Sequence, residues 1–212
     1  MITKRSKMNI LAIGPHPDDI EIGCGATLAK SVERGHDVYL FVATAGAAGG
    51  EEKIRRKEQE DSAKILGAKQ LFWGAMEDTK IEANKESIMQ LEKIIEIIQP
   101  DLIFVNYVND THQDHRNMAA IVTSATRYVR NVLYYETPTT LEFHPNIYVE
   151  LNTELIETKE QMLLAHASQI DRTNIKNLSI IEVSRSSAHF RGVQARVAYA
   201  EAFQSVRLFL NL

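Results

Sequence analysis

The chain has 212 residues, of which 44% are hydrophobic and 25% are charged, as is ordinary for a soluble globular protein. Its net charge of -4 at pH 7 gives no electrostatic reason to expect nucleic acid or an anionic membrane as a partner. The single cysteine, Cys24, excludes an intramolecular disulfide and agrees with a reducing compartment, so we expect a cytoplasmic protein.

The N-terminal stretch MITKRSKMNILAIG joins basic residues to a short apolar run. A signal peptide needs a longer apolar region and a small-residue cleavage site, and a membrane-spanning helix needs roughly 20 apolar residues. We therefore interpret the run as a strand and expect no membrane span. The sequence has no internal repeat, low-complexity tract or Pro/Gly-rich linker, which favours a single domain over residues 1–212.

Stretches with the periodicity of strands and of helices alternate along the chain. In chain order, the sequence predicts a strand over residues 8–13, a helix over 18–33, a strand over 37–45, a helix over 51–67, a strand over 70–74, a helix through 88–98, a strand over 101–105, a helix over 118–129, strands over 132–135 and 148–151, and helices over 155–168 and 193–206. This order predicts an α/β fold with a mostly parallel sheet and helices on both of its faces. Such sheets bind ligands at the carboxyl ends of their strands, here after Ile13 and Val105.

The stretch GPHPDDIEIGCG, residues 14–25, places several ionisable groups directly after the first strand. Pro17 disfavours a helical conformation for His16 and suits the first turn of a helix, so Asp18 and Asp19 are predicted on that first turn. We expect His16 and Asp19 to converge on one point while Asp18 faces a neighbouring one. A converging imidazole and carboxylate are the start of a zinc site.

The sequence of this turn allows two other interpretations. Adjacent aspartates after a proline also make a good helix start, with no chemistry implied. A dinucleotide-binding turn is disfavoured, because the loop lacks the G-x-G-x-x-G spacing and two aspartates would repel a pyrophosphate.

A second ionisable cluster, NYVNDTHQDHRN, follows the strand over 101–105. His112 and His115 are three residues apart and would share one face of a helical turn, with Asp114 between them and Asp110 just before. The segment taken alone also fits a solvated loop.

The two clusters meet if their strands are neighbours in the sheet. His16, Asp19 and one of the two histidines would then supply three protein ligands and leave a fourth position for water, the pattern of a catalytic zinc. The other histidine would be free to act on a substrate, oriented by Asp114 or a neighbour.

Together, HPDDIEIGCGATLAK and THQDHRN resemble the PIG-L/LmbE-like family of zinc-dependent N-deacetylases, which act on N-acetylglucosaminyl conjugates and similar amino sugars. The stretches IRRKEQEDSAKILG, HASQ and RGVQARVAYAEAFQSVR are similar to further parts of that family, so the resemblance runs from about residue 8 to about residue 207. It implies a single Rossmann-like domain and a hydrolase that releases acetate and a free amine.

The resemblance also implies roles for individual residues. The metal ligands would be His16, Asp19 and His115, and Asp18 would be the general base. The implied cofactor is Zn²⁺, although a site with nitrogen and oxygen ligands also suits another divalent metal such as Fe²⁺.

His112 would, by the same resemblance, stabilise the oxyanion as an imidazolium that Asp114 favours. The arginine that contacts substrate would be Arg55, with Arg56 as the competing assignment. The sequence assigns no role to His144, His166, His189 and Arg191.

The sequence departs from the common family pattern at Ile20, Ala26 and Gln113 without removing an implied ligand. It leaves the substrate open among amino-sugar conjugates, such as a GlcNAc-malate as in bacillithiol biosynthesis, an inositol conjugate, a nucleotide sugar, a chitin-type disaccharide or an antibiotic sugar. A metal-dependent esterase or phosphoesterase and a non-enzymatic sugar-binding relative are the alternatives. A homo-oligomer is expected from the family alone.

Overall fold

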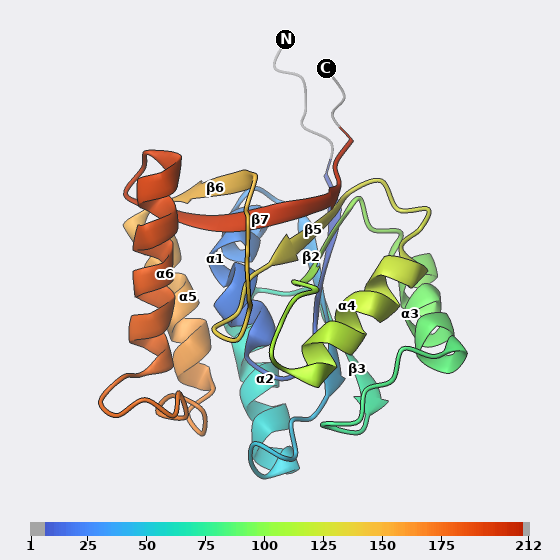
Figure 1. Cartoon of the computed structure of the whole chain (residues 1–212). Helices are drawn as coiled ribbons and strands as arrows, with labels where there is room; N and C mark the ends of the chain where they lie inside the picture. The colour runs from blue at the N-terminus through green and yellow to red at the C-terminus, as the bar shows by residue number, and fades with distance from the viewer. Residues whose placement is uncertain (1–6, 210–212) are drawn as a thin grey trace.

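The computed structural model describes residues 7–209, so the outermost residues of the expected domain, 1–6 and 210–212, lie outside the described part (Figure 1). The strands of the described chain are β1 (Asn9–Gly14), β2 (Asp37–Thr44), β3 (Gln70–Met76), β4 (Leu102–Asn106), β5 (Val132–Tyr135), β6 (Ile147–Leu151) and β7 (Tyr199–Arg207). The helices are α1 (Asp19–Glu33), α2 (Glu52–Leu66), α3 (Lys85–Ile98), α4 (Gln113–Ala125), α5 (Thr153–Ala165) and α6 (Ile180–Ala195).

A seven-stranded sheet in the order β3-β2-β1-β4-β5-β7-β6 forms the centre of the domain. The first five strands in that order are parallel, and β7 pairs in the antiparallel sense with both β5 and β6. The predicted α/β fold with a mostly parallel sheet is therefore confirmed. The chain leaves β1 toward β2 on one side and returns to β4 on the other, so a topological switch point lies between β1 and β4.

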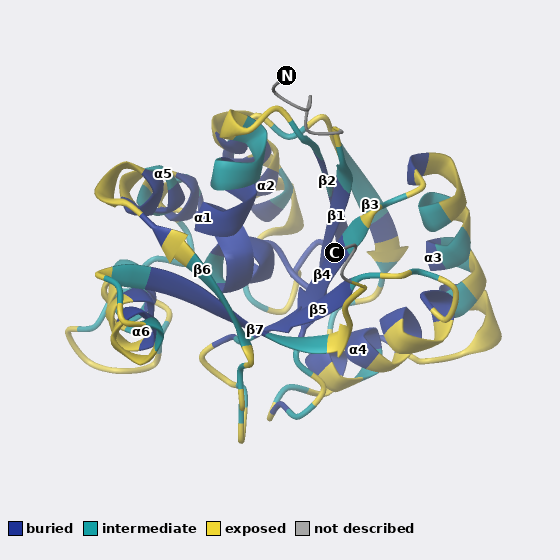
Figure 2. Cartoon of the chain, turned by 90° about the horizontal axis from the view of Figure 1, so that it is seen from above, coloured by how far each residue is buried: buried dark blue, intermediate teal, exposed yellow. Residues whose placement is uncertain are grey.

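Helices cover both faces of the sheet. Figure 2 shows α1, α2, α5 and α6 on one face and α3 and α4 on the other. Alternate residues of β1 supply the two cores, because successive side chains of a strand point to opposite faces. Ile10 packs in the cluster that contains Leu28 of α1, whereas Leu11 packs in the cluster that contains Leu91 of α3.

The GCG stretch inside α1 permits an unusually close approach of other side chains. A Cβ atom added at Gly23 would stand 2.0 Å from Cδ2 of Tyr135, and one at Gly25 would stand 3.1 Å from Cε of Met162. The hydroxyl of Tyr135 donates to the carbonyl of Ile13 over 2.8 Å. These contacts hold the start of α1 against the end of β1.

The expected helix over residues 193–206 is wrong. Helix α6 ends at Ala195, Arg196 takes a left-handed φ of 65°, and the following residues form β7. The alanines and glutamines of this stretch favour a helix locally. Pairing with β5 and β6 overrides that preference, because it satisfies the backbone on both sides and buries Phe203 with its ring centroid 4.9 Å from that of Phe104.

A buried ion pair ties α1 to α5 and β7. The Nζ atom of Lys159 lies 2.7 Å from Oε1 of Glu201 and donates to the carbonyl of Ile22 over 2.7 Å. The Glu201 carboxylate also accepts the backbone N–H groups of Ala26 and Thr27, at 3.1 and 2.7 Å. Both charged side chains are buried. Loss of either charge would leave the other buried without a counter-ion, so the position of α1 depends on the complete network.

Within residues 7–209, no helix has both the length and the apolar character that crossing a membrane requires.

Glu201→Gln is expected to lower the free energy of unfolding by about 3–5 kcal/mol, because it leaves the charge of Lys159 buried without a counter-ion. Urea unfolding measures the loss. Arg185→Gln is the control, since its ion pair with Glu160 is on the surface and such pairs contribute about 0–1 kcal/mol. Equal losses in the two variants would contradict the role of the buried pair.

Candidate metal-dependent active site

The two ionisable clusters meet at the carboxyl edge of the sheet. β1 and β4 are adjacent and parallel, with Ile13 opposite Val105, so the segments that follow them emerge side by side. His16 and Asp19 come from the turn after β1 and the start of α1. His115 lies in the first turn of α4, which begins at Gln113, earlier than the helix predicted from residue 118.

His16, Asp19 and His115 form a compact donor set. Nδ1 of His16 lies 3.1 Å from Oδ2 of Asp19, and Nε2 of His115 lies 3.3 Å from Oδ1 of the same carboxylate. One donor atom from each residue falls within 4.8 Å of the others, and all three residues are buried. Two imidazole nitrogens and one carboxylate oxygen at this spacing fit a divalent metal with an open coordination position.

Outer carboxylates fix the orientation of both imidazole rings. Nδ1 of His115 lies 3.1 Å from Oδ2 of Asp110, and Nε2 of His16 lies 3.1 Å from Oδ2 of Asp114 and 3.2 Å from Oδ1 of Asp78. A proton on each of these outer nitrogens leaves the inner nitrogen of each ring for a metal, as is usual for histidine ligands.

The charge balance of the site also suits a cation. Burial lowers the pKa of His115, but Asp19 and Asp110 outweigh burial and raise it to about 9. Burial likewise opposes protonation of His16, yet the hydrogen bonds of Asp114, Asp19 and Asp78 raise its pKa well above the usual value. Carboxylates that hold protons on two buried rings provide the negative charge that a divalent ion needs.

The sequence predicted Asp18 on the first turn of α1. In the structure, Asp18 lies just before that turn. It is the residue preceding the helix and takes a φ of 91° with a ψ of -28°. Burial and the charge of Asp19 raise its pKa to about 6, while Arg55, His166 and His16 act in the opposite direction. A half-buried carboxylate with this pKa beside a donor set for a metal has the character of a general base.

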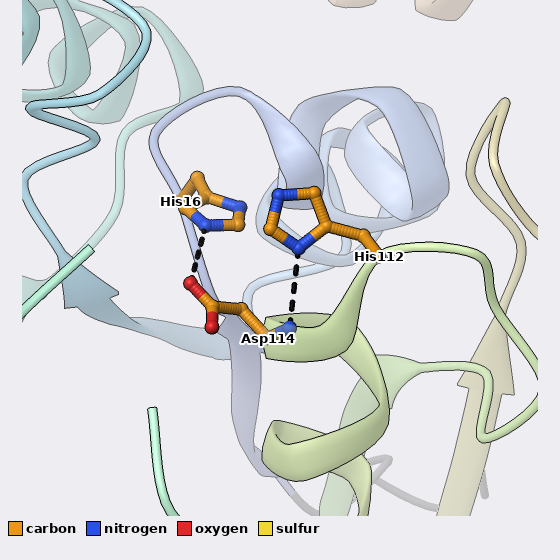
Figure 3. A group of neighbouring side chains, drawn as sticks. All are labelled: His16, His112 and Asp114. Atoms are coloured by element: carbon orange, nitrogen blue, oxygen red, sulfur yellow. Dashed lines mark hydrogen bonds and ion pairs between the residues drawn. The ribbon is translucent and has the colours of Figure 1, made fainter. Parts of the chain in front are cut away.

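The imidazole ring of His112 is held by a backbone N–H group and not by a carboxylate. Its Nδ1 atom accepts the N–H of Asp114 over 3.1 Å (Figure 3). A nitrogen that accepts a hydrogen bond carries no proton, so the ring is the neutral form with its proton on Nε2. Burial, His16 and His115 lower the pKa of His112 and outweigh Asp114 and Asp19, which raise it, and the net direction agrees with that form.

The carboxylate of Asp114 has other partners than His112. It contacts His16, and it accepts the backbone N–H groups of Thr79 and Ile81 at 2.7 and 3.3 Å. His16, His112 and Asp114 also lie close enough to form a second possible donor set. That set suits a metal less well, because the carboxylate oxygens of Asp114 are already occupied by backbone donors.

A cavity of about 300 Å³ opens beside the donor set, and its walls are formed by His16, Asp18, Ala48, Gly49, Arg55, Asp78, Thr79 and His112. The structure thus places Arg55 at the site. Arg56 instead points away, pairs with Glu52 at 2.8 Å and lies over the ring of Trp73.

The GAAGG loop makes room for the Arg55 side chain. A Cβ atom at Gly46 would stand 2.0 Å from its Nη1, and one at Gly49 would stand 2.7 Å away. Its guanidinium donates to the carbonyls of Gly46 and Pro17 at 2.9 and 2.8 Å and lies 3.3 Å from Oδ2 of Asp18. Its Nε–H group is buried and has no hydrogen-bond partner.

Sequence reasoning missed Asp78 and gave Asp110 no role. Asp78 follows β3, and its second oxygen accepts the N–H of Ala48 over 2.7 Å. Its position after a third parallel strand is the only signal that pointed to the site. The contact of His16 with Asp78 lowers the pKa of that carboxyl to about 2. Of the unassigned residues, His166 is buried with Nε2 3.7 Å from Oε1 of Glu21.

The fold and the donor set define an α/β protein with a candidate metal site at the switch point of its sheet. Residues 11–126 match the family model PIG-L, described as GlcNAc-PI de-N-acetylase, and the chain belongs to this family. It is 35% identical over 170 residues to the uncharacterized deacetylase YaiS of Escherichia coli (strain K12), and the match covers 76% of this chain and 92% of that protein.

Solved structures agree with this assignment. The N,N'-diacetylchitobiose deacetylase from Pyrococcus horikoshii has a TM-score of 0.82 at 28% identity, over 95% of this chain and 85% of that one. GalB, the 4-carboxy-2-hydroxymuconate hydratase from Pseudomonas putida KT2440, also has a TM-score of 0.82, at 22% identity over 97% and 99% of the two chains. The second likeness concerns the fold alone, so the reaction must be argued from the site.

His115→Ala is expected to abolish tight binding of a divalent metal, because it removes one nitrogen of the donor set. Addition of zinc at 100 times its Kd should stabilise the unaltered protein by about 2.7 kcal/mol and the variant by much less. Metal content after dialysis and unfolding with and without zinc give the answer. His144→Ala, at an exposed residue, is the control and should bind metal normally. Normal metal content in His115→Ala would contradict the site.

Proposed function

We propose that this chain is a metal-dependent deacetylase that removes the N-acetyl group from an N-acetylglucosamine-type amino sugar and gives acetate and a free amine. One observation carries the proposal. The donor set of His16, Asp19 and His115 lies beside the half-buried carboxylate of Asp18, which lines a cavity of about 300 Å³. Membership of the PIG-L family and the deacetylases among its relatives support the same reaction.

Zinc is the proposed metal, held by Nδ1 of His16, a carboxylate oxygen of Asp19 and Nε2 of His115, with another divalent ion such as Fe²⁺ as the alternative. When bound, such an ion lowers the pKa of water and polarises a carbonyl group. Asp114 and Asp110 act indirectly, since they hold the outer nitrogens of the two imidazole rings.

Asp18 is the proposed general base. Its pKa of about 6 leaves it ionised at neutral pH and yet close enough to neutral pH to take up a proton. It removes a proton from the attacking water and then delivers that proton to the nitrogen of the leaving amine. Arg55 steadies the carboxylate from 3.3 Å away.

His112 is the proposed donor to the developing oxyanion. The neutral ring fixed by the Asp114 N–H group can present its Nε2 proton to the acetyl oxygen. This replaces the imidazolium that the family resemblance implied, because Nδ1 is already used as an acceptor. The carboxylate of Asp114 contacts His16, so Asp114 favours a charged His112 only through its nearby negative charge.

The sugar would lie in the cavity, whose wall includes the guanidinium of Arg55 and the carboxylate of Asp78 as groups that could bind its hydroxyls. A second cavity of about 730 Å³ adjoins it and shares Gly49 and His112. It gives space for the group attached to the sugar, so a conjugate such as GlcNAc-malate or a disaccharide is a better candidate than free N-acetylglucosamine.

The test is acetate release from a panel of N-acetylglucosamine conjugates, with the metal content of the same sample determined. Release that disappears on chelation and returns with zinc would support the proposal and identify the conjugate. A protein loaded with metal that releases no acetate from any conjugate would contradict it and favour an esterase or phosphoesterase. A protein that cannot be loaded would favour a sugar-binding relative. A homo-oligomer and a cytoplasmic location stay predictions of the sequence.

Asp18→Asn is expected to reduce kcat by about 100-fold to 10,000-fold, because the amide cannot accept the proton of water. Its metal content should equal that of the unaltered protein, since Asp18 is outside the donor set. Acetate release and metal analysis on one preparation check both statements. Near-normal turnover with metal bound would show that another group is the base.

Arg55→Met is expected to raise KM about tenfold or more, because it removes a charged donor from the cavity wall. Arg56→Met is the matched control on the same helix, and it should leave KM near the unaltered value because Arg56 faces outward. Steady-state acetate release measures both. A larger effect in Arg56→Met would reverse the assignment of the two arginines.

A further inference from the structure

Asp18 has a backbone conformation that its side chain does not favour. Its φ of 91° lies in the left-handed region, which residues other than glycine adopt rarely. Such a conformation persists only where surrounding contacts impose it, and it is found most often at functional sites. The contacts that hold this peptide therefore decide where the carboxylate of Asp18 lies.

Gln59 of α2 makes the contact at the backbone of Asp18. Its side-chain Oε1 accepts the N–H of Asp18 over 3.2 Å, and its Nε2 donates to Oε1 of Glu21 over 2.6 Å. Ser62 donates to the same oxygen of Glu21 over 2.7 Å. Gln59 and Ser62 are 0% exposed and Glu21 is 1% exposed, so no solvent competes for these groups.

This network fixes which way the Gln59 amide faces. A carboxylate needs a donor, and a backbone N–H needs an acceptor, so only one orientation of the amide satisfies both neighbours. Arg55 lies one helical turn before Gln59 and donates to the carbonyl of Pro17 over 2.8 Å. Helix α2 thus holds the peptide before Asp18 from two directions.

We propose that Gln59 is a positioning residue for the general base, which holds Asp18 in its left-handed conformation and so aims the carboxylate into the cavity. The inference rests on the proposed function in one respect, namely that Asp18 is the base. The conformational part of the inference stands on the hydrogen bonds alone.

Gln59→Met removes the acceptor while keeping an unbranched side chain of similar size. We expect kcat to fall about 100-fold, as for a misplaced catalytic group, with KM and metal content near their unaltered values. This division is expected because Gln59 bonds to Asp18 and Glu21, makes no hydrogen bond to the metal donor set and does not line the cavity. A variant that loses metal together with activity would indicate general disruption and overturn the inference.

A paired exchange provides a rescue that a merely structural role would not produce. Gln59→Glu alone places two carboxylates together and should lose activity. In the double variant Gln59→Glu with Glu21→Gln, the carboxylate at position 59 can accept both the Asp18 N–H and the amide N–H of position 21. This variant should recover most of the lost kcat. Gln90→Met on α3, which removes a hydrogen bond to the carbonyl of Gly74, is the matched control and should leave kcat unchanged. Absence of rescue would contradict the proposed network.

A crystal structure of Gln59→Met gives a result that needs no substrate. The φ of Asp18 should leave the left-handed region in the variant, and its retention there would overturn the inference. If the unaltered protein releases no acetate from any conjugate, the proposed function fails while this structural result still decides the role of Gln59.

Discussion

Parallel pairing of β1 with β4 is the constraint on which the candidate site depends. The register sets Ile13 beside Val105, so the chain leaves both strands at the same level of the sheet. Only for that reason can the single carboxylate of Asp19 lie between the rings of His16 and His115, which are far apart in sequence. A different strand order would leave two unrelated polar loops.

Burial of so many ionisable groups is tolerated because each has a partner. The inner nitrogens of the His16 and His115 rings contact Asp19. Their outer nitrogens contact Asp110, Asp114 and Asp78, and backbone N–H groups donate to other oxygens of these carboxylates. An unpaired buried charge would cost several kcal/mol, on the order of the whole stability of a domain. The same partners hold the donor atoms in place before any substrate binds, which is what a preorganised site requires.

The sequence was informative wherever the chemistry is local. Strand and helix periodicity predicted most elements, and the two ionisable clusters predicted where the site would form. The stretch after residue 193 was misjudged, because its helical composition says nothing about the open edges of β5 and β6 that it fills. Asp78 was missed because a single acidic residue in a polar loop carries no periodic signal. The sequence did not show how Asp114 acts: its backbone N–H contacts His112, while its carboxylate contacts His16.

The sequence by itself determined the kinds of residue available and their order: imidazoles and carboxylates after two strands of an α/β protein of the PIG-L family. Tertiary structure alone decided which nitrogen of His16 faces Asp19, that Nδ1 of His112 accepts the N–H of Asp114, that Arg55 and not Arg56 lines the cavity, and that Asp18 is held in a left-handed conformation. The physical reason is that the direction of a side chain at the end of a strand depends on packing and hydrogen bonds from distant segments, here α2 and the loop after β3. No local pattern encodes those contacts.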